Sequence, residues 1–160
     1  MIDESAIGVH FDFPREYDWH LVPLFEHVQI ERYTWYVACS ENYCSCNGHI
    51  KQFLPDGVYS GKAFKRLIYS TGEYYIHLIR LIAVPAGMPF EQERIHTYED
   101  YVNSNAQIVL LSADSIVDFY AKELNVLKPV MEFCEQNYSV SGKQPYFLTI
   151  ANDTRTGFWI

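Results

Sequence analysis

The sequence predicts an α+β fold: a single mixed, largely antiparallel sheet with helices packed against it. Three observations lead to this prediction. Short apolar segments, several with a period of two, recur between turn residues and indicate strands. Between them lie segments whose apolar residues recur at helical spacing. No repeat, linker or low-complexity segment divides residues 1–160, so we expect a single globular domain.

In the first third of the chain we expect a strand, a helix and a second strand. Residues 8–13 alternate apolar with polar side chains, and Pro14 ends the alternation. From residue 14 to 28, apolar residues recur at helical spacing, although Pro23 weakens a helix there. Residues 34–38 are rich in β-branched and aromatic side chains, which favour a strand.

A hairpin is the clearest local prediction. Asn47-Gly48 is the strongest hairpin dipeptide in the chain, and it lies between the expected strands 43–46 and 49–53. Pro55-Asp56-Gly57 then favours a turn.

The rest of the chain alternates helices with strands. Helices are expected over 61–69, from Thr97 onward, and over 123–137, where Pro129 either kinks the helix or marks its start. Strands are expected at 74–84, 107–112, 116–120 and 146–150. The apolar run within 107–112 predicts a central strand buried on both faces.

Charge and composition narrow the classes of function. The 20 acidic and 12 basic residues give a net charge of −8, which disfavours binding to nucleic acid or to an anionic membrane. No amino-terminal apolar run indicates a signal peptide, and the apolar stretch 74–85 is too short to span a bilayer. We therefore expect a cytoplasmic protein whose four cysteines are free thiols.

Several segments together carry a resemblance to a known family. They are residues 11–17, 33–36, 97–100, 107–111 with Asp114-Ser115, and 152–156. The chain resembles a family of short uncharacterised proteins of Gram-positive bacteria, domain of unknown function 2691. Asn152-Asp153-Thr154-Arg155-Thr156 is the most specific part of the likeness, whereas residues 39–46 and 157–159 depart from it. The family implies no activity, so the resemblance assigns no catalytic residue.

Two segments have the residue types of known sites without their spacing. Cys39, Cys44, Cys46 and His49 could supply four zinc ligands, but the two-residue knuckle is missing, so we interpret them as thiols beside a hairpin. Residues 57–63 contain three residues between their glycines where a phosphate loop has four, and Ala63 follows the lysine. We interpret that segment as a turn into a helix, and we expect no cofactor.

Six residues are candidates for contact with a ligand or a partner: Trp19, Trp35, Tyr36, Arg80, Asp153 and Arg155. Asp153 and Arg155 lie in the closing polar turn, where they form either a structural ion pair or a recognition site. Of the histidines, His20 and His27 are expected as a surface pair on a helix, and His77 as a core histidine.

Two hypotheses of function follow, and an unrecognised enzyme is the third. The first is an immunity- or antitoxin-like protein that covers a basic protein partner, because tyrosine and tryptophan anchor interfaces and negative charge accelerates the encounter. The second is a binder of a nucleotide-like signal in phage–host defence. In that case Trp19, Trp35 or Tyr36 stacks on a base, and Arg80 or Arg155 contacts phosphate.

Overall fold

The computed structural model describes residues 8–12, 21–46, 48–70, 74–90, 98–113, 116–137 and 139–142. Within them, eight strands form one sheet, and helices accompany it. The α+β class predicted from the sequence is confirmed. Every described strand pairing is antiparallel, which agrees with the prediction of a largely antiparallel sheet. The described residues contain no parallel pair.

Strands and helices alternate along the chain much as the sequence predicts. The strands are β1 (Gly8–Asp12), β2 (Tyr33–Cys46), β3 (His49–Gln52), β4 (Gly57–Tyr59), β5 (Tyr74–Pro85), β6 (Ile108–Ala113), β7 (Ile116–Ala121) and β8 (Ser139–Gly142). The helices are α1 (Leu21–Phe25), α2 (Gly61–Ser70), α3 (Tyr98–Val102) and α4 (Leu124–Asn137), and a 3-10 turn η1 (Ile30–Arg32) leads into β2.

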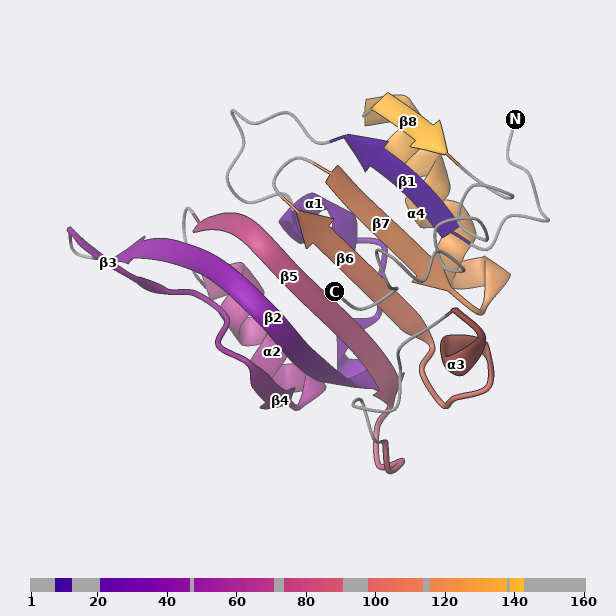
Figure 1. Cartoon of the computed structure of the whole chain (residues 1–160), viewed down its shortest axis with the longest axis horizontal. Coiled ribbons are helices and arrows are strands. Elements are labelled where there is room, and N and C mark those ends of the chain that lie inside the picture. Colours follow the sequence, from indigo (N-terminus) through magenta and orange to yellow (C-terminus); the bar gives the residue numbers. More distant parts are fainter. Residues whose placement is uncertain are drawn as a thin grey trace.

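The sheet brings distant parts of the chain together. Its strand order is β3-β2-β5-β6-β7-β1-β8, and β4 also pairs with β2 (Figure 1). The first strand, β1, therefore lies between β7 and β8, which are the last two described strands in sequence order. This insertion makes β1 a neighbour of residues more than 100 positions away.

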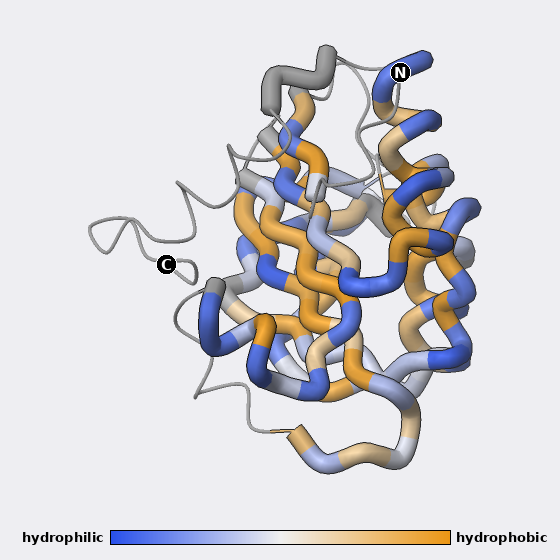
Figure 2. Tube along the Cα trace, turned by 90° about the vertical axis from the view of Figure 1, so that its right-hand side faces the viewer, coloured by the Kyte–Doolittle hydropathy of each residue, from blue (hydrophilic) through white to orange (hydrophobic). Residues whose placement is uncertain are grey.

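Three helices cover one face of the sheet. Figures 1 and 2 show α1, α2 and α4 on the same side, and apolar residues from all three join one core cluster with the strands. We call this the helix-covered face and the opposite one the outer face. Because side chains alternate across a strand, each strand sends every second residue to each face.

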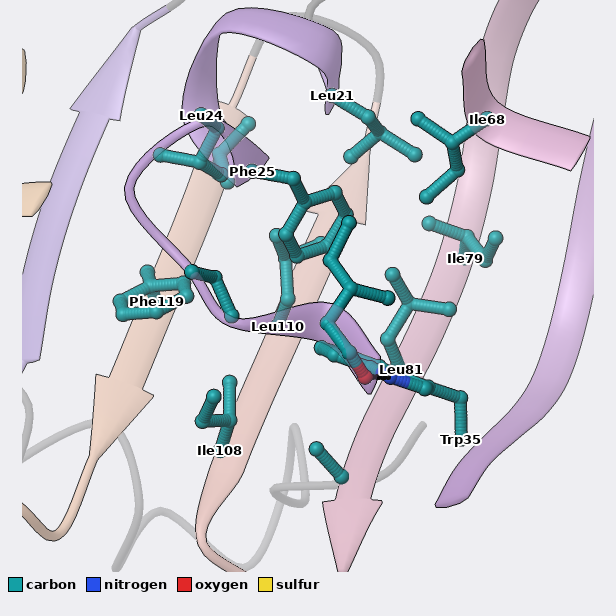
Figure 3. Packing of buried hydrophobic residues seen from close by; sticks show 14 of the residues in the cluster. Leu21, Leu24, Phe25, Trp35, Ile68, Ile79, Leu81, Ile108, Leu110 and Phe119 are labelled. Carbon is teal, nitrogen blue, oxygen red and sulfur yellow. Dashed lines mark hydrogen bonds between the residues drawn. The ribbon is translucent and has the colours of Figure 1, made fainter. Parts of the chain in front are cut away.

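Trp35 of β2 lies at the centre of the helix-covered face. Its ring stacks on Phe64 of α2 with centroids 4.6 Å apart, and Phe25 of α1 meets it edge-on at 5.3 Å. The indole N–H donates to the Ile30 carbonyl at 3.0 Å. Figure 3 shows leucine and isoleucine side chains of β5 and β6 completing this core. Trp35 thus links two helices to the sheet and has its one polar atom satisfied.

Local sequence explains where α2 and the hairpin begin. The Ser60 hydroxyl accepts a hydrogen bond from the Ala63 amide at 3.1 Å and so caps α2. A Cβ atom on Gly61 would lie 2.6 Å from Cα of Glu31, so only glycine allows α2 to approach η1 this closely. Gly48 has φ +79° in the turn between β2 and β3, which confirms the predicted hairpin.

A second, smaller cluster occupies one end of the outer face. Its buried members are Ile82, Val84, Tyr101, Ala106, Val109 and Tyr120. Tyr101 belongs to α3, which thereby covers this end of the sheet (Figure 1). Lys122 lies over the Tyr101 ring at 5.0 Å and donates to the Ser104 carbonyl at 2.6 Å, and its burial lowers its pKa.

Some predicted boundaries differ from the structure. Strand β2 runs for 14 residues, far beyond the predicted 34–38, because it continues into the hairpin. Helix α1 spans only Leu21–Phe25 of the predicted 14–28 and contains Pro23, whereas residues 13–20 lie outside the described part. Pro129 lies inside α4 rather than at its start. The predicted strand 146–150 also falls outside the described residues.

Candidate functional site

The outer face contains the candidate site, because polar and exposed aromatic side chains gather there. Strand registers define a row of residues that lie opposite one another across five strands: Ala38, Arg80, Leu111, Asp118 and His10. We call this set the Arg80 row. All five side chains are partly exposed, so a ligand on the outer face can reach the row.

A histidine–aspartate pair closes one end of the Arg80 row. Nδ1 of His10 on β1 and Oδ1 of Asp118 on β7 are in close hydrogen-bonding contact. Their side chains are only 12% and 13% exposed, so solvent screens the contact weakly. An aspartate at Nδ1 fixes the orientation of an imidazole ring, as it does in many enzymes.

Arg80 on β5 lies two strands from Asp118 in the same row, with Leu111 of β6 between them. Its Nε atom is buried, and the side chain as a whole is partly exposed. The row therefore places a cation and a histidine–aspartate pair on one face of the sheet. A guanidinium group is well suited to bind carboxylate or phosphate oxygens.

Exposed side chains form a second group on the outer face, near the β3 end of the sheet. Tyr43 of β2 and Tyr75 of β5 lie directly opposite each other and are 48% and 39% exposed. Ile50 of β3, which is 79% exposed, shares their side of the sheet, because Gln52 two residues further along β3 pairs with Tyr43. We call Glu41, Tyr43, Ile50, Tyr75 and His77 the tyrosine strip.

His77 belongs to this strip and not to the core, so the prediction of a core histidine is wrong. Its side chain is half exposed, and Nε2 lies 3.7 Å from Oε2 of Glu41. The ring is nearly parallel to that of Tyr75, with centroids 6.4 Å apart. The apolar sequence around His77 suggested burial, but this part of β5 is buried on its helix-covered face only.

The six predicted contact residues differ in where the structure places them and in whether it describes them. Trp35 is fully buried in the helix-covered core, so its ring offers no surface for stacking on a ligand. Tyr36 and Arg80 both lie on the outer face, on neighbouring strands, and both are partly exposed. Trp19, Asp153 and Arg155 lie outside the described residues.

The predicted cysteine cluster is only partly described. Cys44 is buried in the core and is a free thiol, and His49 is exposed on β3. The side chains of Cys39 and Cys46 lie outside what the structure describes. Among the described residues, no group of three or more histidine, cysteine, aspartate or glutamate side chains could hold a metal ion.

Sequence reasoning missed the His10–Asp118 pair. The two residues are 108 positions apart, and only the pairing of β1 with β7 brings them together. A signal does exist: each is a polar residue between two apolar neighbours in its strand, which places it on the face opposite those neighbours. That signal shows which face a residue occupies but cannot show its partner on another strand.

Comparison with known proteins places the chain in a family. Residues 6–159 match the model described as "Protein of unknown function (DUF2691)". The chain belongs to this family. It is also similar to the uncharacterised protein YncE of Bacillus subtilis (strain 168), with 31% identity over 157 residues, which cover 96% of this chain and 98% of that relative. The family resemblance seen in the sequence is therefore confirmed. No solved structure matches the chain.

The same family is found in a Gram-positive bacterium, as the resemblance implied, and its description assigns no activity. Among the described residues, no helix is long and apolar enough to cross a membrane. The assignment of a function therefore depends on the outer face itself.

Proposed function

We propose that the protein binds a basic protein partner through the tyrosine strip on its outer face. The observation that carries this proposal is the exposure of Tyr43 and Tyr75 side by side on neighbouring strands, next to the highly exposed Ile50. Exposed aromatic rings are the side chains that most often dominate binding energy at protein interfaces. Grouped exposed apolar side chains on a soluble protein commonly mark a site of interaction.

Charge supports a basic partner in particular. The chain carries a net charge of −8, and Glu41 contributes a carboxylate within the strip. By the alternation of β3, His49 and Lys51 project to the side opposite Ile50 and the two tyrosines. Complementary charge accelerates association and excludes acidic proteins. An immunity- or antitoxin-like protein that covers a basic toxin or enzyme has these properties.

A photo-crosslinking experiment tests the proposal. A photoreactive phenylalanine analogue at position 43 should form a crosslink with one basic protein in a lysate of the source cells, and added salt should reduce its yield. The matched control carries the same analogue at Tyr69 of α2, which is 42% exposed but lies on the helix side of the sheet. Equal crosslinking from both positions, or none from position 43, would contradict the proposal.

Substitution provides the complementary measurement. Tyr43→Ala and Tyr75→Ala should each weaken the captured complex by at least ~1–2 kcal/mol if the rings anchor it, while Tyr69→Ala leaves it unchanged. Both tyrosines are substantially exposed, so the melting temperature should change little in any of the three variants. A gene for a basic toxin beside this gene would agree with the immunity-like form of the proposal.

A second candidate function is the binding of a small nucleotide-like ligand, and a specific observation favours it. Tyr36 and Arg80 lie on the same face of adjacent strands, where Tyr36 pairs with Ile82 and Ala38 pairs with Arg80. A ring and a guanidinium so placed could contact a base and a phosphate. Calorimetry with adenosine monophosphate tests this function, and Arg80→Gln should abolish the binding.

A further inference from the structure

Strand β3 is the outermost strand at its end of the described sheet, and its outer edge is open. It pairs with β2 on one side, and no strand among the described residues pairs with its other side (Figure 1). All four residues of β3 are exposed, and the side chain of Ile50 is 79% exposed. An open edge presents backbone N–H and C=O groups that another strand can bond.

The register of β2 and β3 identifies which backbone groups point outward. The Phe53 amide donates to the Asn42 carbonyl at 3.3 Å. Tyr43 lies opposite Gln52, one residue inward from that bond on each strand. In an antiparallel pair this pattern means that Tyr43 and Gln52 exchange no hydrogen bonds, so the N–H and C=O of Gln52 point away from β2. The backbone groups of Ile50, two residues earlier, point the same way.

The neighbouring part of this edge is bonded by side chains, and the outer edge of β3 is not. Where β3 ends, the buried Asn42 side chain donates to the Leu54 carbonyl at 3.1 Å. Within the part of the chain that the structure describes, no group bonds the outward N–H and C=O of Ile50 and Gln52 in this way. β3 also contains no proline and no bulge, two devices that protect strand edges in many proteins.

The open edge continues the surface of the tyrosine strip. Tyr75, Tyr43 and Gln52 lie opposite one another on β5, β2 and β3. The Gln52 side chain donates to Oγ of Ser40 at 3.1 Å, which holds the end of β3 in place. A strand added beside β3 lies about 4.8 Å from it and extends the row by one position. Every second side chain of that strand then lies on the outer side, beside Ile50.

We infer that the basic partner adds an extended segment to β3 as a further strand, with backbone hydrogen bonds to Ile50 and Gln52. The inference rests on the proposed function and deepens it, because it names the form in which the partner binds. In strand addition the backbone supplies affinity, and alternate side chains supply specificity. Because β3 has only four residues, its edge accommodates one short segment.

Side-chain alternation sets the chemistry of the added segment. His49 and Lys51 lie on the side of β3 opposite Ile50. Basic side chains of the segment are disfavoured beside Lys51, because like charges on neighbouring strands destabilise the pairing. They are favoured on the outer side, where aliphatic stems pack on Ile50 and Glu41 contributes a carboxylate to the strip. The segment therefore alternates basic with apolar residues.

Synthetic heptapeptides of alternating lysine and valine test the inference by nuclear magnetic resonance of the whole protein. The unmodified peptide should shift the amide resonances of Ile50 and Gln52 and slow their exchange with solvent. The same peptide N-methylated at every peptide bond keeps its side chains and charge but has no backbone N–H groups, so it should bind at least about tenfold more weakly. A glutamate–valine heptapeptide, the control for charge, should also bind more weakly.

Ile50→Pro and Ile50→Ala separate the backbone of β3 from its side chain. Both substitutions remove the exposed side chain, but only proline removes the N–H. Because that N–H points away from β2, the two variants should have similar melting temperatures. Ile50→Pro should bind the unmodified peptide about tenfold more weakly than Ile50→Ala does, through the lost hydrogen bond and the blocked edge. Equal affinities in two folded variants would contradict strand addition.

Amide exchange in the unsubstituted protein decides the inference even if Ile50→Pro disturbs the hairpin. It is measured with the peptide and in the complex with the protein that crosslinks to position 43. The inference is wrong if the Ile50 and Gln52 amides are unaffected in both, or if the N-methylated or the acidic peptide binds as well as the unmodified one. In those cases continued crosslinking from position 43 leaves the proposed function standing, and loss of that crosslink removes both.

Discussion

Trp35 and Tyr36 are neighbours in β2, yet they enter opposite environments. The Trp35 ring is enclosed between α1, α2 and the sheet, with its N–H bonded to a backbone carbonyl. The Tyr36 ring lies on the outer face, where it packs against Phe90 and stays partly exposed. The same contrast runs through β5, where Leu81 is fully buried and Arg80 is not.

The contrast shows that the two faces of the sheet differ in what they contribute to stability and in the side chains they expose. The helix-covered face buries the larger of the two apolar clusters and supplies most of the stability, because burial of apolar area is the dominant favourable term in folding. The outer face carries the Arg80 row and the tyrosine strip at positions that stability does not require to be apolar. Substitutions on the two faces should therefore differ in both size and kind.

The largest expected effect separates the two neighbours directly. Trp35→Ala should lower the free energy of unfolding by ~3–5 kcal/mol, because it leaves a cavity beside Phe64 and Phe25. Tyr36→Ala should lower it by only about 1 kcal/mol, since its ring is partly exposed already. Denaturant unfolding of both variants gives the two values. Similar losses would show that the outer face is as important for stability as the core.

A smaller effect comes from the buried thiol of Cys134 in α4. Burial raises the pKa of Cys134 to about 12 from 9.0, so the folded state retains a proton that the unfolded state releases. The free energy of unfolding should therefore fall as the pH rises above about 9, up to about 12. Cys134→Ala should reduce this alkaline decline when unfolding is measured across that range. An identical decline in the variant would contradict burial of the thiol.

The smallest effect is expected within the tyrosine strip. Glu41 and His77 are about half exposed and 3.7 Å apart, and such a surface pair contributes ~0–1 kcal/mol. Glu41→Gln should accordingly change the free energy of unfolding by less than about 0.5 kcal/mol, while it slows association with a basic partner. A large loss of stability would show that the strip is part of the folding core.

Local patterns were sufficient to predict most strands and helices of the described chain. The Asn47-Gly48 hairpin, the helix over 61–69 and the central strand over 107–112 each depend on neighbouring residues, and each is present. Strands β4 and β8 were not predicted. They are short, and β4 pairs with residues 35–37 of β2 on the edge opposite β5. Residue order alone does not show that such a short segment joins this edge.

The candidate site was less accessible to sequence reasoning. Arg80 and Tyr36 were recognised as contact candidates from residue type, and the structure adds that they share a face. Trp35 was chosen by the same criterion, but large aromatic residues occur in cores as readily as on surfaces. Trp35 is buried in the core. The contact between His10 and Asp118 could not be predicted, because it depends on the order of the strands in the sheet. No local sequence pattern shows that order.

Along the edge of β2 opposite β5, the strand pairing is interrupted at residues 53–56, which connect β3 to β4. The buried Asn42 side chain donates to the Leu54 carbonyl at 3.1 Å and accepts from its amide, and the Asp56 carboxylate accepts from the Ser40 amide at 2.9 Å. Side chains thus replace the ladder that a single long strand would continue. Long, uninterrupted edges are templates for strand addition and aggregation. With only three and four residues in β4 and β3, this side of the sheet offers a growing fibril little to pair with.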